Sequence, residues 1–236
     1  MRSQNNTTNQ PANAPALTRK MARAALIGLD ETTSAVLTEC FHQFGIMTTA
    51  LEVSDAQRLS VQKFDACALR LDGSAERVLE IIRRAPANFR MVVYGLANST
   101  AQALRYSRFG VNAILDEPID KRAALRVVRA THLLVVHEFR RYVRIPLATP
   151  VAIACEGRKI QGQSVELSGG GISIEAPALT VGAPVNVEFV LPKSDKLRLT
   201  ATVRWHKGGL LGVRFEENDP ARQKVKEWID RYLGIG

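Results

Sequence analysis

The chain has 236 residues, of which 46% are hydrophobic and 23% are charged, and it carries a formal net charge of +9. This composition excludes fibrous and fully disordered proteins, and the length is enough for two domains of about 100 residues each. No uncharged apolar run approaches the ~20 residues that span a bilayer, and the first 23 residues lack the apolar core of a secretory signal. We therefore expect a cytoplasmic protein that does not insert into membranes.

Three cysteines, Cys40, Cys67 and Cys155, stand far apart in the sequence, two of them within apolar runs. Their spacing matches neither a disulfide framework nor a Cys-x-x-Cys metal site. We expect buried, reduced thiols, no metal site and no cofactor.

The positive charge is distributed unevenly along the chain. Residues 24–139 carry equal numbers of basic and acidic side chains, whereas residues 140–236 carry fifteen basic against ten acidic ones. The acidic residues are interspersed among the basic ones, which argues against a nucleic-acid-binding face. The single tight cluster, which favours a small anionic ligand, consists of Arg140, Arg141 and Arg144.

Residues 1–22 are rich in Asn, Thr, Pro and Ala and have too little apolar surface to offset the entropy of ordering, so we predict a disordered tail. From residue 23 to 138, short apolar runs alternate with helical periodicities, which is typical of β-α units around a parallel sheet. The apolar runs that predict strands cover 24–29, 66–71, 91–94 and 113–115. The predicted helices cover 34–44, 75–84, 100–109 and 120–139.

A second domain, residues 139–236, shows a period of two after the arginine cluster, and its turns are rich in Gly and Pro. This pattern predicts a six-stranded antiparallel β-barrel followed by a helix that begins near Asp219-Pro220. We expect both tryptophans, Trp205 and Trp228, to belong to the core. The predicted strands cover 151–155, 165–167, 172–174, 185–189, 197–205 and 211–215.

The order of β-α units, the Glu117-Pro118 pair after Ala-Ile-Leu-Asp, and the phrase Arg-Phe-Gly-Val-Asn-Ala-Ile-Leu that begins at Arg108 resemble the response-regulator receiver domain. The resemblance extends over residues 23–138. It implies a doubly wound parallel sheet of five strands. It also implies a phosphorylation site, whose residues can be compared one by one.

The receiver phosphorylation chemistry is largely missing. Arg70 stands where the phosphoaccepting Asp belongs, Gly95 replaces the Thr or Ser, and Glu117 replaces the Lys. Asp30 remains of the acidic pair that holds Mg²⁺, and Asp72 lies two residues, or ~6.6 Å, too far along its strand to substitute for the phosphoacceptor. We expect no phosphorylation and an ion pair of Arg70 with Asp30 or Glu117. The domain would then serve as a scaffold for a homodimer or for an unidentified protein partner.

The C-terminal half contains two short motifs in a fixed order: Arg140-x-x-x-Arg144 before the first strand and Glu166-x-Ser168-x-x-Gly171 between the second and third strands. Together with the strand pattern, these motifs resemble the PilZ domain over residues 138–233. The resemblance implies binding of bis-(3′,5′)-cyclic dimeric GMP, which is abbreviated below as cyclic di-GMP. It also implies an output in motility, exopolysaccharide or biofilm behaviour.

The residue chemistry suits that ligand. Guanidinium groups pair with phosphates, fork onto guanine O6 and N7, and stack on purine faces. We therefore expect Arg140 and Arg144 to form a clamp, with Arg141 beside them, on a linker that becomes ordered around the ligand. Phe139 precedes this clamp and is placed to pack on a guanine or to exclude a second ligand.

The second motif offers acceptors for the guanine edge. Glu166 and Ser168 are two residues apart and face the same side of a strand, where they meet the N1–H and N2–H₂ donors. Gly171 allows a base to approach the backbone. Glu166 departs from the family pattern, which has Asp or Asn there, and a poor fit would lose ~1 to 3 kcal/mol of binding.

These observations predict a non-enzymatic cyclic di-GMP effector in which ligand binding at the joint changes how the two domains are placed. No Ser, Cys or His has the base and orienting acid that nucleophilic catalysis needs at a recognisable spacing. The alternative is an adaptor in which both domains have lost their ligands and bind proteins. A nucleic-acid-binding role comes third.

Overall fold

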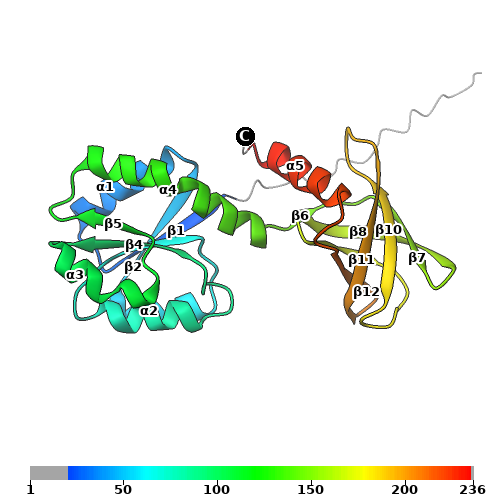
Figure 1. Cartoon of the computed structure of the whole chain (residues 1–236), viewed down its shortest axis with the longest axis horizontal. Coiled ribbons are helices and arrows are strands. Elements are labelled where there is room, and N and C mark those ends of the chain that lie inside the picture. Colours follow the sequence, from blue (N-terminus) through cyan, green and yellow to red (C-terminus); the bar gives the residue numbers. More distant parts are fainter. Residues whose placement is uncertain (1–20, 235–236) are drawn as a thin grey trace, which may run out of the picture.

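The computed structural model describes residues 21–234, which form two domains connected by one long helix (Figure 1). Most of the expected disordered tail, residues 1–20, lies outside the described residues. The first strand begins at Ala22, which is buried, two residues before the predicted strand over 24–29 and inside the segment predicted to be a disordered tail.

The N-terminal domain contains a five-stranded sheet in which every neighbouring pair is parallel, in the order β2-β1-β3-β4-β5. This confirms the doubly wound, receiver-like fold. The second strand was not recognised from the sequence because only its two end residues are buried. The strands are β1 (Ala22–Ile27), β2 (Ile46–Leu51), β3 (Ala66–Arg70), β4 (Val92–Ala97) and β5 (Ala113–Asp116).

Helices cover both faces of this sheet. One face packs against α1 and α4, and the opposite face packs against α2 and a 3₁₀ turn, as the two separate apolar clusters show. The predicted helix over 100–109 is divided into a short α-helix and a 3₁₀ turn. The helical elements are α1 (Glu31–His42), η1 (Val53–Ser60), α2 (Ala75–Arg84), α3 (Thr100–Arg105), η2 (Ser107–Phe109) and α4 (Lys121–Tyr142).

The three cysteines are buried, free thiols, as predicted. Cys40 lies on α1 and Cys67 on β3, on opposite faces of the sheet. Burial raises the pKa of the Cys67 thiol to about 12 and also raises the pKa of Cys40. Both thiols are therefore protonated at neutral pH and behave as small apolar groups.

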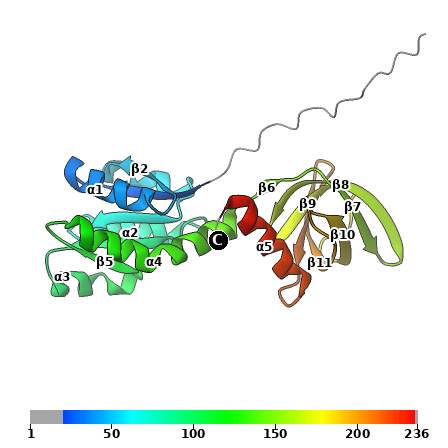
Figure 2. The ribbon, with the colours of Figure 1, turned by 90° about the horizontal axis from the view of Figure 1, so that it is seen from above.

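Helix α4 extends three residues past its predicted end and carries the chain out of the first domain (Figure 2). Phe139, just before this extension, and Val143, Ile145 and Leu147 after it are all buried in an apolar cluster that continues into the second domain. Burial of each such side chain contributes about 1.5 to 3 kcal/mol. The expected linker is thus a packed joint, and Phe139 belongs to the core instead of facing a ligand.

The C-terminal domain is a closed antiparallel barrel in the order β8-β7-β10-β11-β12-β9, which returns to β8, as predicted. A seventh, two-residue strand, β6, pairs with β8 on the side of the joint. The strands are β6 (Ile145–Pro146), β7 (Pro150–Cys155), β8 (Arg158–Ser168), β9 (Gly171–Glu175), β10 (Pro184–Val190), β11 (Lys196–Lys207) and β12 (Leu210–Phe215).

The closing helix α5 (Ala221–Leu233) follows Asp219-Pro220 as expected. Asp219 Oδ1 accepts a hydrogen bond from the Ala221 backbone N–H at 2.9 Å, which satisfies a donor at the start of the helix. Trp228 on α5 is buried, as predicted, and its indole N–H donates to the carbonyl oxygen of Pro192 at 3.1 Å.

The prediction that Trp205 belongs to the core is wrong. At a β-bulge in β11, Val203 pairs with Val213 of β12 and Trp205 pairs with the next residue, Gly212. One residue of β11 is therefore left without a partner in this pairing. The extra residue, Arg204, reverses the alternation of faces beyond it. Trp205 therefore lies outside the barrel with 44% of its surface exposed.

Across residues 21–234, no helix combines the length and the apolar character that crossing a membrane requires.

Candidate functional site

The pairing of β6 with β8 brings the two sequence motifs together. Ile145 pairs with Leu167 and Pro146 pairs with Glu166 in an antiparallel register. Arg144 comes directly before β6, and Ser168 directly follows the paired residues on β8. The arginine cluster and the Glu-x-Ser motif therefore meet at one end of the barrel, although about twenty residues separate them in sequence.

A row of directly paired residues crosses the barrel wall from this point. Glu166 on β8 pairs with Ser173 on β9, Ser173 pairs with Gly212 on β12, and Gly212 pairs with Trp205 on β11. Directly paired residues point to the same face of a sheet. Glu166, Ser173 and Trp205 therefore share the outer face, and Gly212 between them leaves the surface without a side chain.

Gly212 is required by the indole that covers it. A Cβ atom at this position would lie 2.1 Å from Trp205 Cε2, so any larger residue would displace the ring. The ring lies over Gly212 and remains partly exposed. It forms a wall beside the polar residues of the row.

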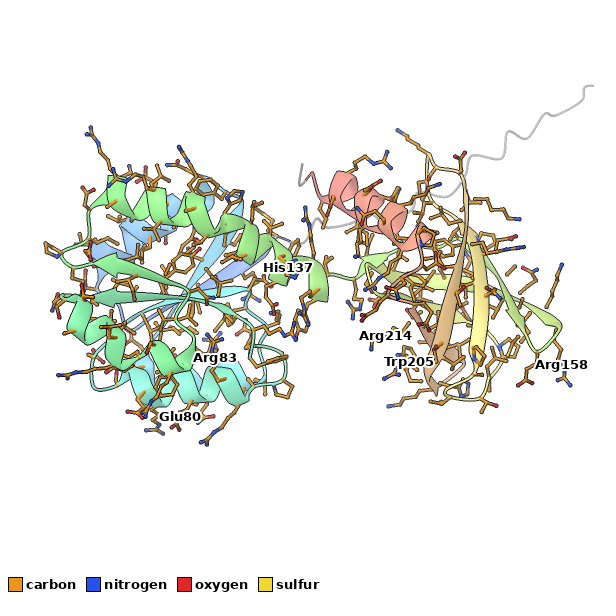
Figure 3. All side chains as sticks on the ribbon, in the orientation of Figure 1. Glu80, Arg83, His137, Arg158, Trp205 and Arg214 are labelled. Carbon is orange, nitrogen blue, oxygen red and sulfur yellow. The ribbon has the colours of Figure 1, made fainter. Side chains whose placement is uncertain are left out.

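A groove of about 340 Å³ lies over this row. It contains five of the six residues that the sequence motifs predicted for the site, namely Arg141, Arg144, Glu166, Ser168 and Gly171. The polar and aromatic lining side chains that were not predicted are Ser173, Arg204, Trp205 and Arg214. In Figure 3, Trp205 and Arg214 lie on the side of the barrel that faces the N-terminal domain, whereas Arg158 lies at the far tip of the β7–β8 hairpin.

The sixth predicted residue, Arg140, lines a neighbouring cavity of about 690 Å³ instead. Its Nε lies 2.7 Å from Asp230 Oδ1 on α5, but this buried N–H does not form a hydrogen bond. Arg140 and Arg141 both belong to the last turn of α4, so they diverge around the helix. Arg141 and Arg214 line both cavities and so connect them.

Ser168 and Gly171 also form the turn between β8 and β9. The Ser168 hydroxyl donates to the Gly171 carbonyl oxygen at 3.1 Å and accepts from the Gly170 N–H at 3.4 Å. A Cβ atom on Gly171 would lie 2.2 Å from the Val213 carbonyl oxygen of the adjacent strand. Close strand packing therefore requires glycine here, which differs from the expected role of admitting a base.

In the N-terminal domain, Arg70 occupies the position of the receiver phosphorylation site and pairs with both Asp30 and Glu117, which the sequence had offered as alternative partners. Its Nε lies 2.6 Å from Glu117 Oε1, and its Nη2 lies 2.8 Å from Asp30 Oδ2. These bonds, the one with Glu117 first, raise the pKa of Arg70. The Thr33 backbone N–H and then Arg70 hold the pKa of Asp30 well below its usual value.

The surroundings of Arg70 also oppose a simple restoration of the site. Asp72 accepts hydrogen bonds from the Ser74 backbone N–H at 2.8 Å and from its hydroxyl, and so forms the turn before α2. A Cβ atom on Gly95 would lie 2.6 Å from Leu71 Cδ1, so a hydroxyl-bearing residue there would require Leu71 to move.

We predict that the Arg70→Asp variant remains unmodified by acetyl phosphate and Mg²⁺, because the hydroxyl and the ammonium of the receiver site are still missing at positions 95 and 117. Intact-mass spectrometry of wild type and variant is the measurement. A phosphoryl adduct on the wild type, at Asp30 or Asp72, would contradict the reading of this domain.

The sequence profile of the family described as PilZ domain matches residues 138–233. The PilZ domain of CeSA from a cellulose-synthesizing bacterium is a similar solved structure, with 22% identity and a TM-score of 0.32 over 39% of this chain and 95% of that one. The receiver domain of the sensor histidine kinase PA1611 from Pseudomonas aeruginosa PAO1 shares 17% identity, with a TM-score of 0.41 over 50% of this chain and 99% of that one.

The Bacillus subtilis inhibitor of motility, MotI/DgrA, shares 21% identity, with a TM-score of 0.34 over 40% of this chain and 51% of that one. No curated protein matches the sequence. The profile match coincides with the barrel and its closing helix. Residues 138–233 of this chain therefore match the PilZ domain, a module that is typically a cyclic di-GMP-binding effector.

Proposed function

We propose that this protein is a cyclic di-GMP effector whose ligand binds in the groove on the outer face of the barrel. The observation that carries this proposal is the β6–β8 pairing, which joins the arginine cluster to the Glu166–Ser168 motif in one cavity. Neither motif alone would make an anion site with hydrogen-bond acceptors. Together they offer both kinds of group that a guanine nucleotide needs.

The groove suits the parts of the ligand as follows. Arg141 and Arg144 pair with phosphate oxygens, because charge-assisted guanidinium–phosphate contacts are short and directional. Glu166 is half-buried and accepts from the guanine N1–H and N2–H₂ donors. Trp205 offers a flat apolar face to the purine, and base–aromatic stacking of this kind contributes about 1 to 3 kcal/mol.

Arg140 connects ligand binding to the joint between the domains. Arg140 is paired with Asp230 on α5, through a contact that lacks a hydrogen bond. A phosphate at the rim of the groove competes for this guanidinium. Transfer of Arg140 from Asp230 to the ligand changes the contact between the end of α4 and α5. A protein partner bound to the receiver-like domain responds to this change.

We predict that Arg144→Ala weakens cyclic di-GMP binding by about tenfold or more, because a charge-assisted hydrogen bond contributes ~1.5 to 3 kcal/mol. Calorimetric titration is the measurement. Arg158→Ala is the matched control, since Arg158 is an exposed arginine of the same domain at the far hairpin tip. Equal losses in both variants would reveal a non-specific charge effect and contradict the proposed site.

We predict that ligand binding changes tryptophan fluorescence through Trp205, and that Trp205→Ala weakens binding by about tenfold. The chain has two tryptophans, and the other, Trp228, is buried on α5 and donates to the Pro192 carbonyl oxygen. Trp228→Phe therefore retains the fluorescence response, while Trp205→Phe loses it. A response that follows Trp228 would place the ligand away from the outer face.

We predict that Glu166→Asp binds as tightly as wild type or more tightly, and that Glu166→Ala binds more weakly. The shorter acid reaches the guanine donors with less strain, whereas deletion leaves those donors without a charged acceptor. Competition assays on the three proteins test this order. Should Glu166→Ala match wild type while Ser168→Ala and Arg140→Ala do not, Glu166 would not contact the base.

A wild type that shows no binding in these titrations would overturn the effector proposal. The adaptor interpretation, in which both domains act through protein contacts, would then take its place.

A further inference from the structure

The end of α4 carries a carboxylate that the ligand chemistry does not explain. Glu138 lies three residues before Arg141 and is only 3% exposed. Its Oε1 accepts a hydrogen bond from Lys63 Nζ at 3.0 Å, and its Oε2 lies 3.8 Å from Arg141 Nε. Glu138 is therefore shared between a lysine of the N-terminal domain and an arginine of the groove.

Lys63 serves a second buried carboxylate at the same time. Its Nζ lies 3.6 Å from Oδ1 of Asp65, which is 4% exposed, and 4.1 Å from the ring centroid of Tyr142. The other oxygen of Asp65 accepts from the Arg23 backbone N–H at 2.9 Å. Burial raises the pKa of Asp65, and the nearby Glu138 raises it further.

The charges in this cluster are balanced only when Arg141 is included. Two buried carboxylates, Asp65 and Glu138, face one lysine, and Arg141 supplies the second positive charge. A buried carboxylate without a positively charged partner raises the free energy of the folded protein, so the ion pairs of this cluster resist separation. Arg141 also lines the groove, where an anionic ligand competes for the same guanidinium.

We propose that Lys63 of the N-terminal domain sets the anion affinity of the barrel groove, through the Glu138 carboxylate that it shares with Arg141. With Lys63 in place, Glu138 is shared between two cations and holds Arg141 less tightly than it would alone, so the ligand competes for Arg141 more easily. When Lys63 is withdrawn, for instance by a partner that binds the loop between η1 and β3, Glu138 holds Arg141 and the ligand binds more weakly. This regulation rests on the proposed function and concerns the same groove.

The relation is reciprocal because linkage is symmetric. A ligand that draws Arg141 toward the groove leaves Lys63 as the main cation beside Glu138, so the Lys63–Glu138 ion pair becomes stronger. The contact between α4 and the loop that carries Lys63 and Asp65 is then tighter in the bound state. The last turn of α4, beside the labelled His137 in Figure 3, lies between the two domains, where such a change alters their joint.

The first test measures cyclic di-GMP affinity by calorimetry. Lys63→Met keeps the aliphatic stem and removes the charge, and we expect it to raise Kd about tenfold. Lys63→Arg restores affinity to near the wild-type value. Lys121→Met is the matched control, because it removes a lysine of the same domain that pairs with the exposed Glu39, outside the cluster. An unchanged Kd in Lys63→Met overturns the proposal.

A second pair of variants distinguishes sharing of Glu138 from a general field effect. In an Arg141→Met background, Lys63→Met is expected to change Kd by less than about twofold, because the guanidinium that it acts through is absent. The same tenfold loss in both backgrounds would mean that Lys63 acts as a distant charge, and would overturn the proposal.

Should Lys63→Met not fold, Glu138→Gln tests the same step, with an expected fivefold fall in Kd as Arg141 is released. An unchanged or higher Kd in that variant would likewise overturn the proposal.

A measurement without ligand separates this inference from the proposed function. The melting temperature of Lys63→Met/Arg141→Met should fall by roughly 4 °C more than the sum of the two single shifts, because only the double variant leaves Glu138 without a cation. Additive shifts overturn the sharing of Glu138. A wild type that does not bind cyclic di-GMP overturns the proposed function, while a non-additive melting cycle in that case still supports the shared carboxylate.

Discussion

The arrangement of the site depends on the two-residue pairing of β6 with β8. The pairing continues through the hydrogen bond from Leu147 N to Val165 O at 3.0 Å and is closed by Ser164, whose hydroxyl donates to the Leu147 carbonyl and accepts from Thr149 N at 2.9 Å. Backbone groups that leave a helix must find partners elsewhere, and here they find them on the barrel. Arg144 is thus held between a helix end and a strand, so the helix cannot turn without moving it.

This constraint explains why the joint is packed and not flexible. Phe139 and Val143 enter the same apolar cluster as the barrel interior, so separating the domains would expose surface that contributes several kcal/mol. A buried ion cluster in the same place adds little net stability, since desolvation cancels much of the attraction between its charges. Its effect is greater on geometry, because Lys63, Glu138 and Arg141 satisfy one another only when α4 and its neighbouring loop are in register.

The sequence predicted the elements whose signal is local or strongly periodic. The parallel sheet, the barrel, the start of α5 and the ion pairs of Arg70 all followed from residue patterns. Trp205 was misplaced because a bulge changes the register without any change in composition, and only the partner strand reveals it. Because of the same bulge, the sequence did not predict that Arg204 lines the groove. The extension of α4 was missed because the arginines that end it read equally well as a solvated helix terminus or as a linker.

The two domains differ in how their arginine side chains are paired with carboxylates. A receiver domain changes its state when phosphorylation adds charge at its site, but here Arg70 permanently supplies a cation to Asp30 and Glu117. The cation at this position is therefore already paired with two carboxylates. In contrast, Arg141 of the barrel groove is paired with Glu138, and Arg140 of the neighbouring cavity is paired with Asp230. Under the proposed function, an anionic ligand exchanges with these carboxylates. Under the proposed function, signals would therefore enter through the barrel groove or through a partner that contacts Lys63, and the receiver-like domain would be the fixed body against which the joint changes.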